Sequence, residues 1–313
     1  MPRQPEMDIA YCGACGEVTV IKVIASLPAG VTVGACNICH TRSLRPTPSA
    51  EAISNHYSQY YLTRNNESAR ITRLVDMHAG ILDYLLAHLP AGNRYRFLDI
   101  GFGNGAFLLQ VAARGHLAFG ADVSAQNIRQ LETMCAAKGA SISTIDISSD
   151  SYASLGCESF DVITLFQVIE HMAEPRTQLQ QLAAFQKSGD LLYLECPNDN
   201  ALFARLKNTW RWLPNRKRMW RSLKYPEHLN GFSRHSISTV LEKAGYRVEA
   251  CGDYAYLDGV HQVEAEFWWP RVHSALRDLS PVSLLRSAVP LFDKAASTLF
   301  GAGSGLFALA RRL

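Results

Sequence analysis

Four cysteines near the start of the chain have the spacing of a metal site. Cys12 and Cys15 form one close pair, Cys36 and Cys39 form the other, and the pattern is C-x2-C-x20-C-x2-C. The β-branched segment between the pairs, residues 17–33, predicts a hairpin that brings them together. Four thiolates favour a structural zinc ion, with iron–sulfur ligation as the alternative. A closed four-thiolate site leaves no open position for catalysis.

A second group of chemically capable side chains follows an apolar run in "LFQVIEHMAEP", residues 165–175. Gln167, Glu170 and His171 occur there within five positions, and His228 occurs in "YPEHLNGF". Carboxylate and imidazole groups beside a reacting centre can transfer protons. We predict that Glu170 and His228 are catalytic and that His171 contacts the substrate. The alternatives are that Glu170 caps a helix and that His171 is a surface histidine.

The elements around these residues predict an α/β sheet. Residues 96–115 give a short apolar strand, a glycine-rich turn and a helix. Further strands are predicted to end near Asp122, near Asp146, at Phe166 and at Pro197. An acidic residue about twenty positions after a glycine-rich turn can accept both ribose hydroxyls of an adenosine. Strands that alternate with helices predict a mostly parallel sheet, with ligands at the carboxyl ends of the strands.

This series resembles the class I S-adenosylmethionine-dependent methyltransferases, through "LDIGFGNG", Asp122, Asp146, "FDVITLFQVIEH" and "CPN". Nicotinamide dehydrogenases usually have G-x-G-x-x-G, whereas this turn has G-x-G-x-G. The resemblance implies a Rossmann-like fold with a mostly parallel seven-stranded sheet and S-adenosylmethionine as cofactor. It implies that Asp99 and the glycines flank the methionine part, that Asp122 holds the ribose and that Asp146 and Ile147 bracket the adenine. Gln167 lies where the fourth strand opens onto the methyl group. The implied cofactor-binding set is Asp99, Gly101, Gly103, Gly105, Asp122, Val123, Asp146, Ile147 and Gln167.

The segment 200–232 predicts the acceptor site, because eight basic and no acidic residues occur from Arg205 to Lys224. Three of the five tryptophans of the chain, Trp210, Trp212 and Trp220, lie among them and would line an apolar part of the substrate. Basic and aromatic residues together suit single-stranded RNA, but the net charge of +3 argues against nucleic acid. They also suit a phosphate or diphosphate head with an apolar tail, and a Mg²⁺ ion would accompany the diphosphate. The predicted substrate contacts are Tyr57, Tyr61, His171, Asn198, Arg205, Lys207, Trp210, Arg211 and Tyr225.

A carboxylate base, tryptophans and a basic head-group site resemble the prenyl diphosphate C-methyltransferases. That resemblance implies methyl transfer to an alkene, with geranyl diphosphate methylated at C6 as the leading acceptor. Glu170 would then deprotonate the resulting carbocation. Methylation of a nucleotide sugar or glycan is the alternative, and there His228 would be the general base. A non-catalytic module that binds RNA or a protein partner is a further alternative.

The predicted organisation has four parts: a zinc ribbon (1–46), a helical cap (47–92), the cofactor domain (93–260) and a helical tail (261–313). A second helix of the cap is expected over about 68–89, with apolar residues at helical spacing. Two roles fit the tail, packing on the body or at an interface between copies, and peripheral membrane contact. No signal peptide or spanning segment is evident, and eight cysteines in 313 residues do not suggest a disulfide scaffold, so we expect a cytoplasmic protein.

Overall fold

The computed structural model describes most of the chain, which forms two compact units. The first contains Met1–Arg64, Gln167–Asp253 and Ser304–Leu313, and the second contains Asn65–Phe166 and Tyr254–Gly303. The residues described are 7–28, 30–49, 52–53, 78–147, 152, 159–209, 219–255, 292–293 and 295–313.

The ribbon forms a four-stranded antiparallel meander in the first unit. Its strands are β1 (Met7–Cys12), β2 (Glu17–Ser26), β3 (Thr32–Cys36) and β4 (Arg42–Arg45), and neighbours in the chain pair with one another. The hairpin predicted between the cysteine pairs is therefore confirmed. Because each cysteine pair lies at a turn between strands, the fold brings the pairs together.

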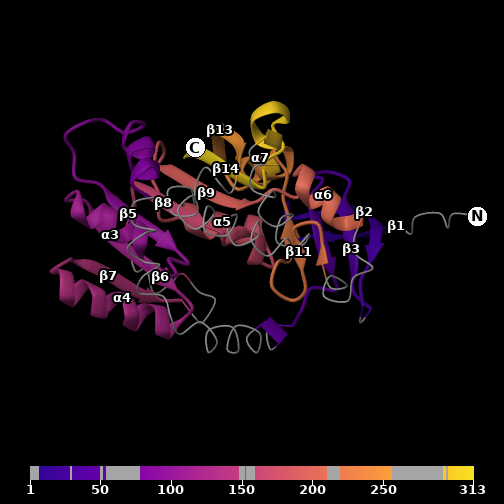
Figure 1. Ribbon diagram of the computed structural model, residues 1–313, viewed down its shortest axis with the longest axis horizontal. Helices are drawn as coiled ribbons and strands as arrows, with labels where there is room; N and C mark the ends of the chain where they lie inside the picture. The colour runs from indigo at the N-terminus through magenta and orange to yellow at the C-terminus, as the bar shows by residue number, and fades with distance from the viewer. Residues whose placement is uncertain are drawn as a thin grey trace, which may run out of the picture. The chain divides into compact units, whose positions relative to one another are not determined.

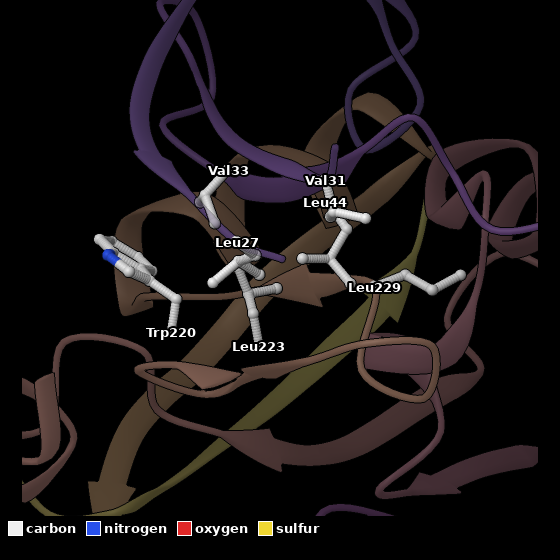
Figure 2. Close-up of a cluster of buried hydrophobic side chains, with 7 residues drawn as sticks. All are labelled: Leu27, Val31, Val33, Leu44, Trp220, Leu223 and Leu229. Atoms are coloured by element: carbon white, nitrogen blue, oxygen red, sulfur yellow. The ribbon is translucent and has the colours of Figure 1, made fainter. Parts of the chain in front are cut away.

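A fifth strand joins the ribbon sheet from a segment far along the chain. In that strand, β12 (Asn230–Gly231), Asn230 pairs with Ser43 and Gly231 with Arg42. Figure 2 shows the apolar cluster that accompanies this pairing, with side chains from the ribbon facing side chains of the later segment. The cluster contains Leu27, Val31, Val33, Leu44, Trp220, Leu223 and Leu229. The ribbon thus shares a sheet and a core with the segment 219–231.

Seven strands form the main sheet, in the order β13-β14-β9-β8-β5-β6-β7. In the second unit β5 (Arg96–Ile100) pairs in parallel with β6 (Leu117–Asp122) and β8 (Val162–Phe166), and β6 pairs in parallel with β7 (Ile142–Asp146). Helices α3 (Ala106–Ala113) and α4 (Ala125–Lys138) make the crossovers and appear beside these strands in Figure 1. The predicted mostly parallel, Rossmann-like sheet is confirmed.

The first unit supplies the other strands and helices. After the short 3-10 helix η2 (Ile169–His171) come α5 (Pro175–Ala183), β9 (Leu191–Pro197) and α6 (Leu202–Thr209). The hairpin β10 (Met219–Trp220) and β11 (Leu223–Lys224) precedes β12, and α7 (Arg234–Lys243) leads into β13 (Tyr246–Tyr254). A capping box at Ser233 and Ser236 starts α7.

The prediction of a wholly helical C-terminal tail is wrong. Residues 295–300 are helical, but Gly305–Arg312 form strand β14, which pairs antiparallel with β9. The segment "GLFALA" is apolar on both faces and therefore suits a strand between two others, here β13 and β9. Most of these residues are buried, so they are not available for membrane contact, although Leu299 and Phe300 are exposed.

Part of the predicted cap is described. Residues 78–86 are helical, and Leu82 and Leu85 are fully buried, as the helical spacing predicts. The earlier half of that predicted helix lies outside the described residues. Among the described residues, no helix is both long and apolar enough to cross a membrane.

Candidate functional site

The four cysteines form a compact and buried sulfur cluster. The Sγ atoms of Cys12 and Cys39 are 3.8 Å apart, as are those of Cys15 and Cys36, and all four lie within 4.8 Å of one another. A tetrahedral zinc ion with Zn–S bonds of about 2.3 Å requires sulfur separations of about 3.8 Å. The cluster therefore fits the zinc ion that the spacing predicts, and four thiolates would leave no open coordination position on such an ion.

The two turns that carry these cysteines have the same backbone design. Gly16 donates its N–H to the carbonyl of Cys12 at 2.7 Å, and His40 donates its N–H to the carbonyl of Cys36 at 3.1 Å. Both donors have left-handed backbones, with φ of 71° and 58°. This conformation reverses the chain after the second cysteine of each pair and points both thiols inward.

The glycine-rich turn and Asp122 form one hydrogen-bonded unit in the second compact unit. Gly101, Gly103 and Gly105 all have positive φ, which a Cβ atom would strain. The N–H of Gly103 donates to Asp122 Oδ2 at 3.0 Å, and Ser124 N–H donates to Asp122 Oδ1 at 2.8 Å. The carboxylate at the end of β6 therefore holds the turn after β5. Burial raises the pKa of Asp122.

Asp99 is the second buried acid of this region. It lies in β5, is 2% exposed, and accepts a hydrogen bond from Thr164 Oγ1 at 2.8 Å. Burial raises its pKa to about 8, the Thr164 hydrogen bond opposes the rise and nearby Asp122 adds to it. Thr164 was not predicted as a site residue, although its hydroxyl stands out in the otherwise apolar strand "VITLF". The pair places a polar group beneath the glycine-rich turn.

The residues predicted to bracket an adenine follow the ends of β6 and β7. Asp122 and Asp146 are partners in the parallel register, and Ile147 donates its N–H to the Asp122 carbonyl at 3.1 Å. Ile147 is buried, whereas half of the Val123 side chain is exposed. The structure thus brings the predicted cofactor residues of β5, β6 and β7 to the same sheet edge, and the apolar Val123 surface there is available to a flat ring.

The strand β8 ends in an unusual backbone conformation. Gln167 has φ of 57°, a left-handed value that is uncommon outside glycine, and its N–H donates to the Glu195 carbonyl at 2.8 Å. Such strain concentrates at functional sites. The chain changes direction at Gln167, η2 begins two residues later, and the Glu170 side chain in η2 is buried.

Glu170 is a buried carboxyl group of the first unit with a strongly raised pKa. It is 1% exposed, and neither carboxylate oxygen has a hydrogen-bond partner among the described residues. Burial raises its pKa to about 8.

Two histidines surround this carboxyl group. The Nε2 atom of His171 lies 3.8 Å from Glu170 Oε1, and the rings of His171 and His228 meet edge to face with centroids 4.8 Å apart. Their Nδ1 atoms lie 2.8 Å and 2.9 Å from the carbonyls of Glu227 and Ser222. In neutral rings this places the hydrogen on Nδ1 and the lone pair on Nε2. Burial lowers the pKa of His228, which favours its neutral form.

Glu170, His171 and His228 could also hold a cation. One ligand atom from each of these three side chains lies within 4.8 Å of the others.

Several predicted substrate residues have structural roles or lie outside the described residues. Asn198 is buried, and its Oδ1 accepts the N–H of Asn200 at 3.0 Å. Tyr225 packs against the ribbon cluster, and Arg205 is exposed on α6. The backbone of Lys207 is helical, but its side chain is not described. Tyr57, Tyr61, Trp210 and Arg211 lie outside the described residues.

The basic segment 200–232 is partly used inside the protein. Trp220 was expected to line a substrate site, but it is buried in the ribbon cluster, with the guanidinium groups of Arg42 and Arg221 5.6 Å and 4.8 Å from its ring centroid. Arg221 donates to the Asp199 carbonyl at 3.3 Å, and Lys224 pairs with Glu227. Arg42, Arg221 and Lys224 therefore already contact acidic, carbonyl or aromatic groups of the protein.

Sequence reasoning did not find the ion pair that organises this segment. Arg42 Nη1 of β4 lies 2.6 Å from Asp199 Oδ2, and the Asp199 side chain is fully buried. The other oxygen of Asp199 accepts the Ser222 hydroxyl at 2.7 Å. The two charged residues are 157 positions apart, so no local pattern could connect them.

The fold and the glycine-rich turn define a Rossmann-like nucleotide-binding α/β protein, and comparisons with known proteins assign its family. The model of the methyltransferase domain family matches residues 67–250, more than half of the chain. The chain belongs to this family.

Curated relatives share the same region. A ubiquinone biosynthesis O-methyltransferase of Rhizobium rhizogenes is 33% identical over 140 residues, which cover 43% of this chain and 56% of the relative. One of Sinorhizobium fredii is 30% identical over 156 residues, which cover 48% and 62%. The chain therefore spans less than two thirds of the length of these relatives.

Solved structures agree in fold alone. Magnesium protoporphyrin IX methyltransferase from Synechocystis, solved with bound S-adenosylhomocysteine, is 14% identical with a TM-score of 0.50, and the match covers 83% of this chain and 96% of that one. Coclaurine N-methyltransferase is 14% identical with a TM-score of 0.51, over 75% and 72%.

Proposed function

We propose that this chain transfers the methyl group of S-adenosylmethionine to a small acceptor, with Glu170 as the general base. The observation that carries the proposal is the buried carboxyl group of Glu170, which has no hydrogen-bond partner among the described residues. Burying an unpaired carboxyl group is costly, so such a group favours a catalytic role over a structural one. Its pKa of about 8 makes the carboxylate a stronger base than an ordinary glutamate, and the fraction of this reactive form rises as pH approaches 8.

The cofactor half of the proposal rests on the second unit. Gly101, Gly103 and Gly105 would let the backbone approach the methionine part, and Asp122 would accept the ribose hydroxyls. Both oxygens of Asp122 already accept backbone N–H groups, so its lone pairs are fixed in direction before a ligand binds. Family membership supports S-adenosylmethionine as the donor.

A hydroxyl group is the leading acceptor. The curated relatives in the comparison are O-methyltransferases, and Glu170 with neutral His228 provides bases for a hydroxyl proton. Glu170 takes that proton, the oxygen forms a bond to the methyl carbon, and the carbon–sulfur bond breaks. The products are a methyl ether, protonated Glu170 and S-adenosylhomocysteine.

An alkene of a prenyl diphosphate is the second candidate, and the dry surroundings of Glu170 favour it. Glu170 is 1% exposed, so little water reaches its carboxyl group. Water at that place would trap a carbocation. The alkene carbon forms the bond to the methyl group, S-adenosylhomocysteine leaves, and Glu170 removes a proton next to the cationic carbon. That proton loss gives a new alkene. The basic segment from Arg205 to Lys224 supplies the sequence argument for a diphosphate.

A divalent cation is an alternative use of the same cluster. Glu170 and the imidazoles of His171 and His228 could ligate a divalent ion, which would orient an anionic acceptor, and two imidazole donors suit a transition metal better than Mg²⁺. Glu170 cannot be a ligand and a free base at once, so metal dependence separates the two roles.

The test is a mass-spectrometric assay of the full chain with S-adenosylmethionine. The acceptors are a catechol, geranyl diphosphate and a nucleotide sugar, each with Mg²⁺ and with EDTA. We expect a methylated product with one acceptor class, no product from Glu170→Gln, and normal product from the control Glu174→Gln, which changes an exposed carboxylate four residues away. Normal turnover by Glu170→Gln would refute the role of Glu170. Activity that requires Mg²⁺ would favour the cation site.

A further inference from the structure

Glu170 has no side-chain hydrogen bond among the described residues to fix its position, so its backbone must be held from outside. We propose that the four-cysteine ribbon is a positioning element for Glu170, and that Ser43, Asn230 and Arg176 are the positioning residues. The inference rests on the proposed role of Glu170, and all of the contacts involved lie within the first compact unit.

The first link runs through the backbone. Leu44 of β4 donates its N–H to the carbonyl of Leu229 at 2.9 Å, and Leu229 donates its N–H to the carbonyl of Glu170 at 2.8 Å. Leu44 and Leu229 are both buried in the apolar cluster of Figure 2. Two hydrogen bonds therefore connect the last ribbon strand to the peptide group of the proposed base.

The second link runs through side chains. The Ser43 hydroxyl donates to Asn230 Oδ1 at 2.6 Å, and Asn230 Nδ2 donates to the carbonyl of Met172 at 2.7 Å. Asn230 is 3% exposed, so loss of either partner would leave a buried amide unsatisfied. This link holds the end of η2, two residues after Glu170.

The third link begins at the metal site itself. Arg176 Nη1 donates to the carbonyls of Cys15 and Gly16 at 3.3 Å each. A Cβ atom on Gly13 would approach the Ala173 carbonyl to 2.6 Å, so the first cysteine turn lies directly against the chain that follows η2. A ribbon that loses its zinc would release this contact.

Ribbon strand and cysteine turn thus hold the segment 169–176 from both sides. The first two links end on the backbone carbonyls of Glu170 and Met172, and the third ends on the side chain of Arg176. The zinc ion would act at a distance, by keeping the ribbon folded. The zinc content of the protein would therefore determine how stable the backbone around Glu170 is.

The test is hydrogen exchange of the full chain, measured by mass spectrometry, together with steady-state kinetics. Ser43→Ala removes one hydrogen bond of the second link, Ser43→Thr keeps it, and Thr32→Ala is the control, because it removes a ribbon hydroxyl that bonds only within the ribbon. We expect Ser43→Ala to speed exchange in residues 169–173 about fivefold and to lower kcat with an unchanged KM for S-adenosylmethionine. Exchange in residues 96–122 should not change, and Ser43→Thr should restore both readouts.

Arg176→Gln and zinc chelation test the third link separately. Both should speed exchange in residues 169–176, with the zinc content measured alongside. Unchanged exchange there in Ser43→Ala and Arg176→Gln, or a uniform increase across the chain, would overturn the proposal. If Glu170→Gln keeps full activity while exchange responds as expected, the proposed base fails but the ribbon still positions the segment.

Discussion

Replacing Glu170 with glutamine should make the protein more stable, by an amount that depends on pH. Burial raises the pKa of Glu170 from an ordinary 4.5 to about 8 in the folded chain. At pH values below both pKa values, the folded and the unfolded chain both hold the proton, and ionisation of Glu170 does not change the free energy of unfolding. Between the two pKa values the unfolded chain loses the proton and the folded chain keeps it, so the folded state loses stability as pH rises.

The magnitude follows from the size of the pKa difference. One pKa unit corresponds to about 1.4 kcal/mol, so the full rise in pH through this window removes up to about 5 kcal/mol. That is comparable to the whole free energy of unfolding of many domains. Glutamine has nearly the same shape and does not ionise, so the Glu170→Gln variant avoids this penalty.

The assay is urea unfolding of the wild-type chain and the variant at several pH values from about 4.5 to about 8.5, a range that brackets both pKa values, followed by tryptophan fluorescence. The stability advantage of the variant should grow steadily with pH, while its enzymatic activity is lost. Glu249→Gln is the control, because hydrogen bonds from Arg311 lower the pKa of Glu249. This variant should be less stable than the wild type by an amount that stays nearly constant over this pH range, since the contribution of Glu249 is lost only below its ordinary pKa. A Glu170→Gln advantage that stays constant across this pH range would refute the buried, unpaired carboxyl group.

Three further predictions follow from individual contacts. Asp122→Asn should weaken S-adenosylmethionine binding by about tenfold or more, since it places an amide against the Gly103 N–H; calorimetry that finds an unchanged Kd would contradict this. Cys36→Ser should lower the zinc content below one ion per chain and lower the Tm, and full metal occupancy would contradict the four-thiolate site. Asp199→Asn should cost about 3 kcal/mol, because it leaves Arg42 without its buried partner, and a cost below about 1 kcal/mol would show that the pair adds little.

The sequence predicted the features that local patterns encode. The hairpin between the cysteine pairs, the turn after β5 and the acids at the ends of β6 and β7 depend on short-range spacing and alternation. Glu170 was chosen for its position after an apolar strand, and burial then gave the physical reason for it. Its isolation from hydrogen-bond donors could not be predicted, because it depends on side chains that are distant in the sequence.

Long-range pairings explain what the sequence did not reveal. The apolar run within Gly305–Arg312 fits a buried helix or a buried strand equally well. The segment is a strand because β9, which is distant in the sequence, offers backbone groups for it to pair with. Trp220 occurs among basic residues and was therefore assigned to a substrate site. The ribbon offers it an apolar cluster and two guanidinium groups instead.

If Glu170 is the base, its lack of hydrogen-bond partners among the described residues gives the ribbon a function in this methyltransferase. A carboxyl group that must be free to meet a substrate proton cannot be fixed by its own oxygens, because any donor that held them would also lower its pKa. Its position must then come from the backbone, and the backbone of a three-residue helix is held by few bonds of its own. The ribbon supplies the missing bonds through Leu229 and Asn230. Because those bonds end on main-chain carbonyls, they would position Glu170 without occupying the carboxyl oxygens that the proposed reaction needs.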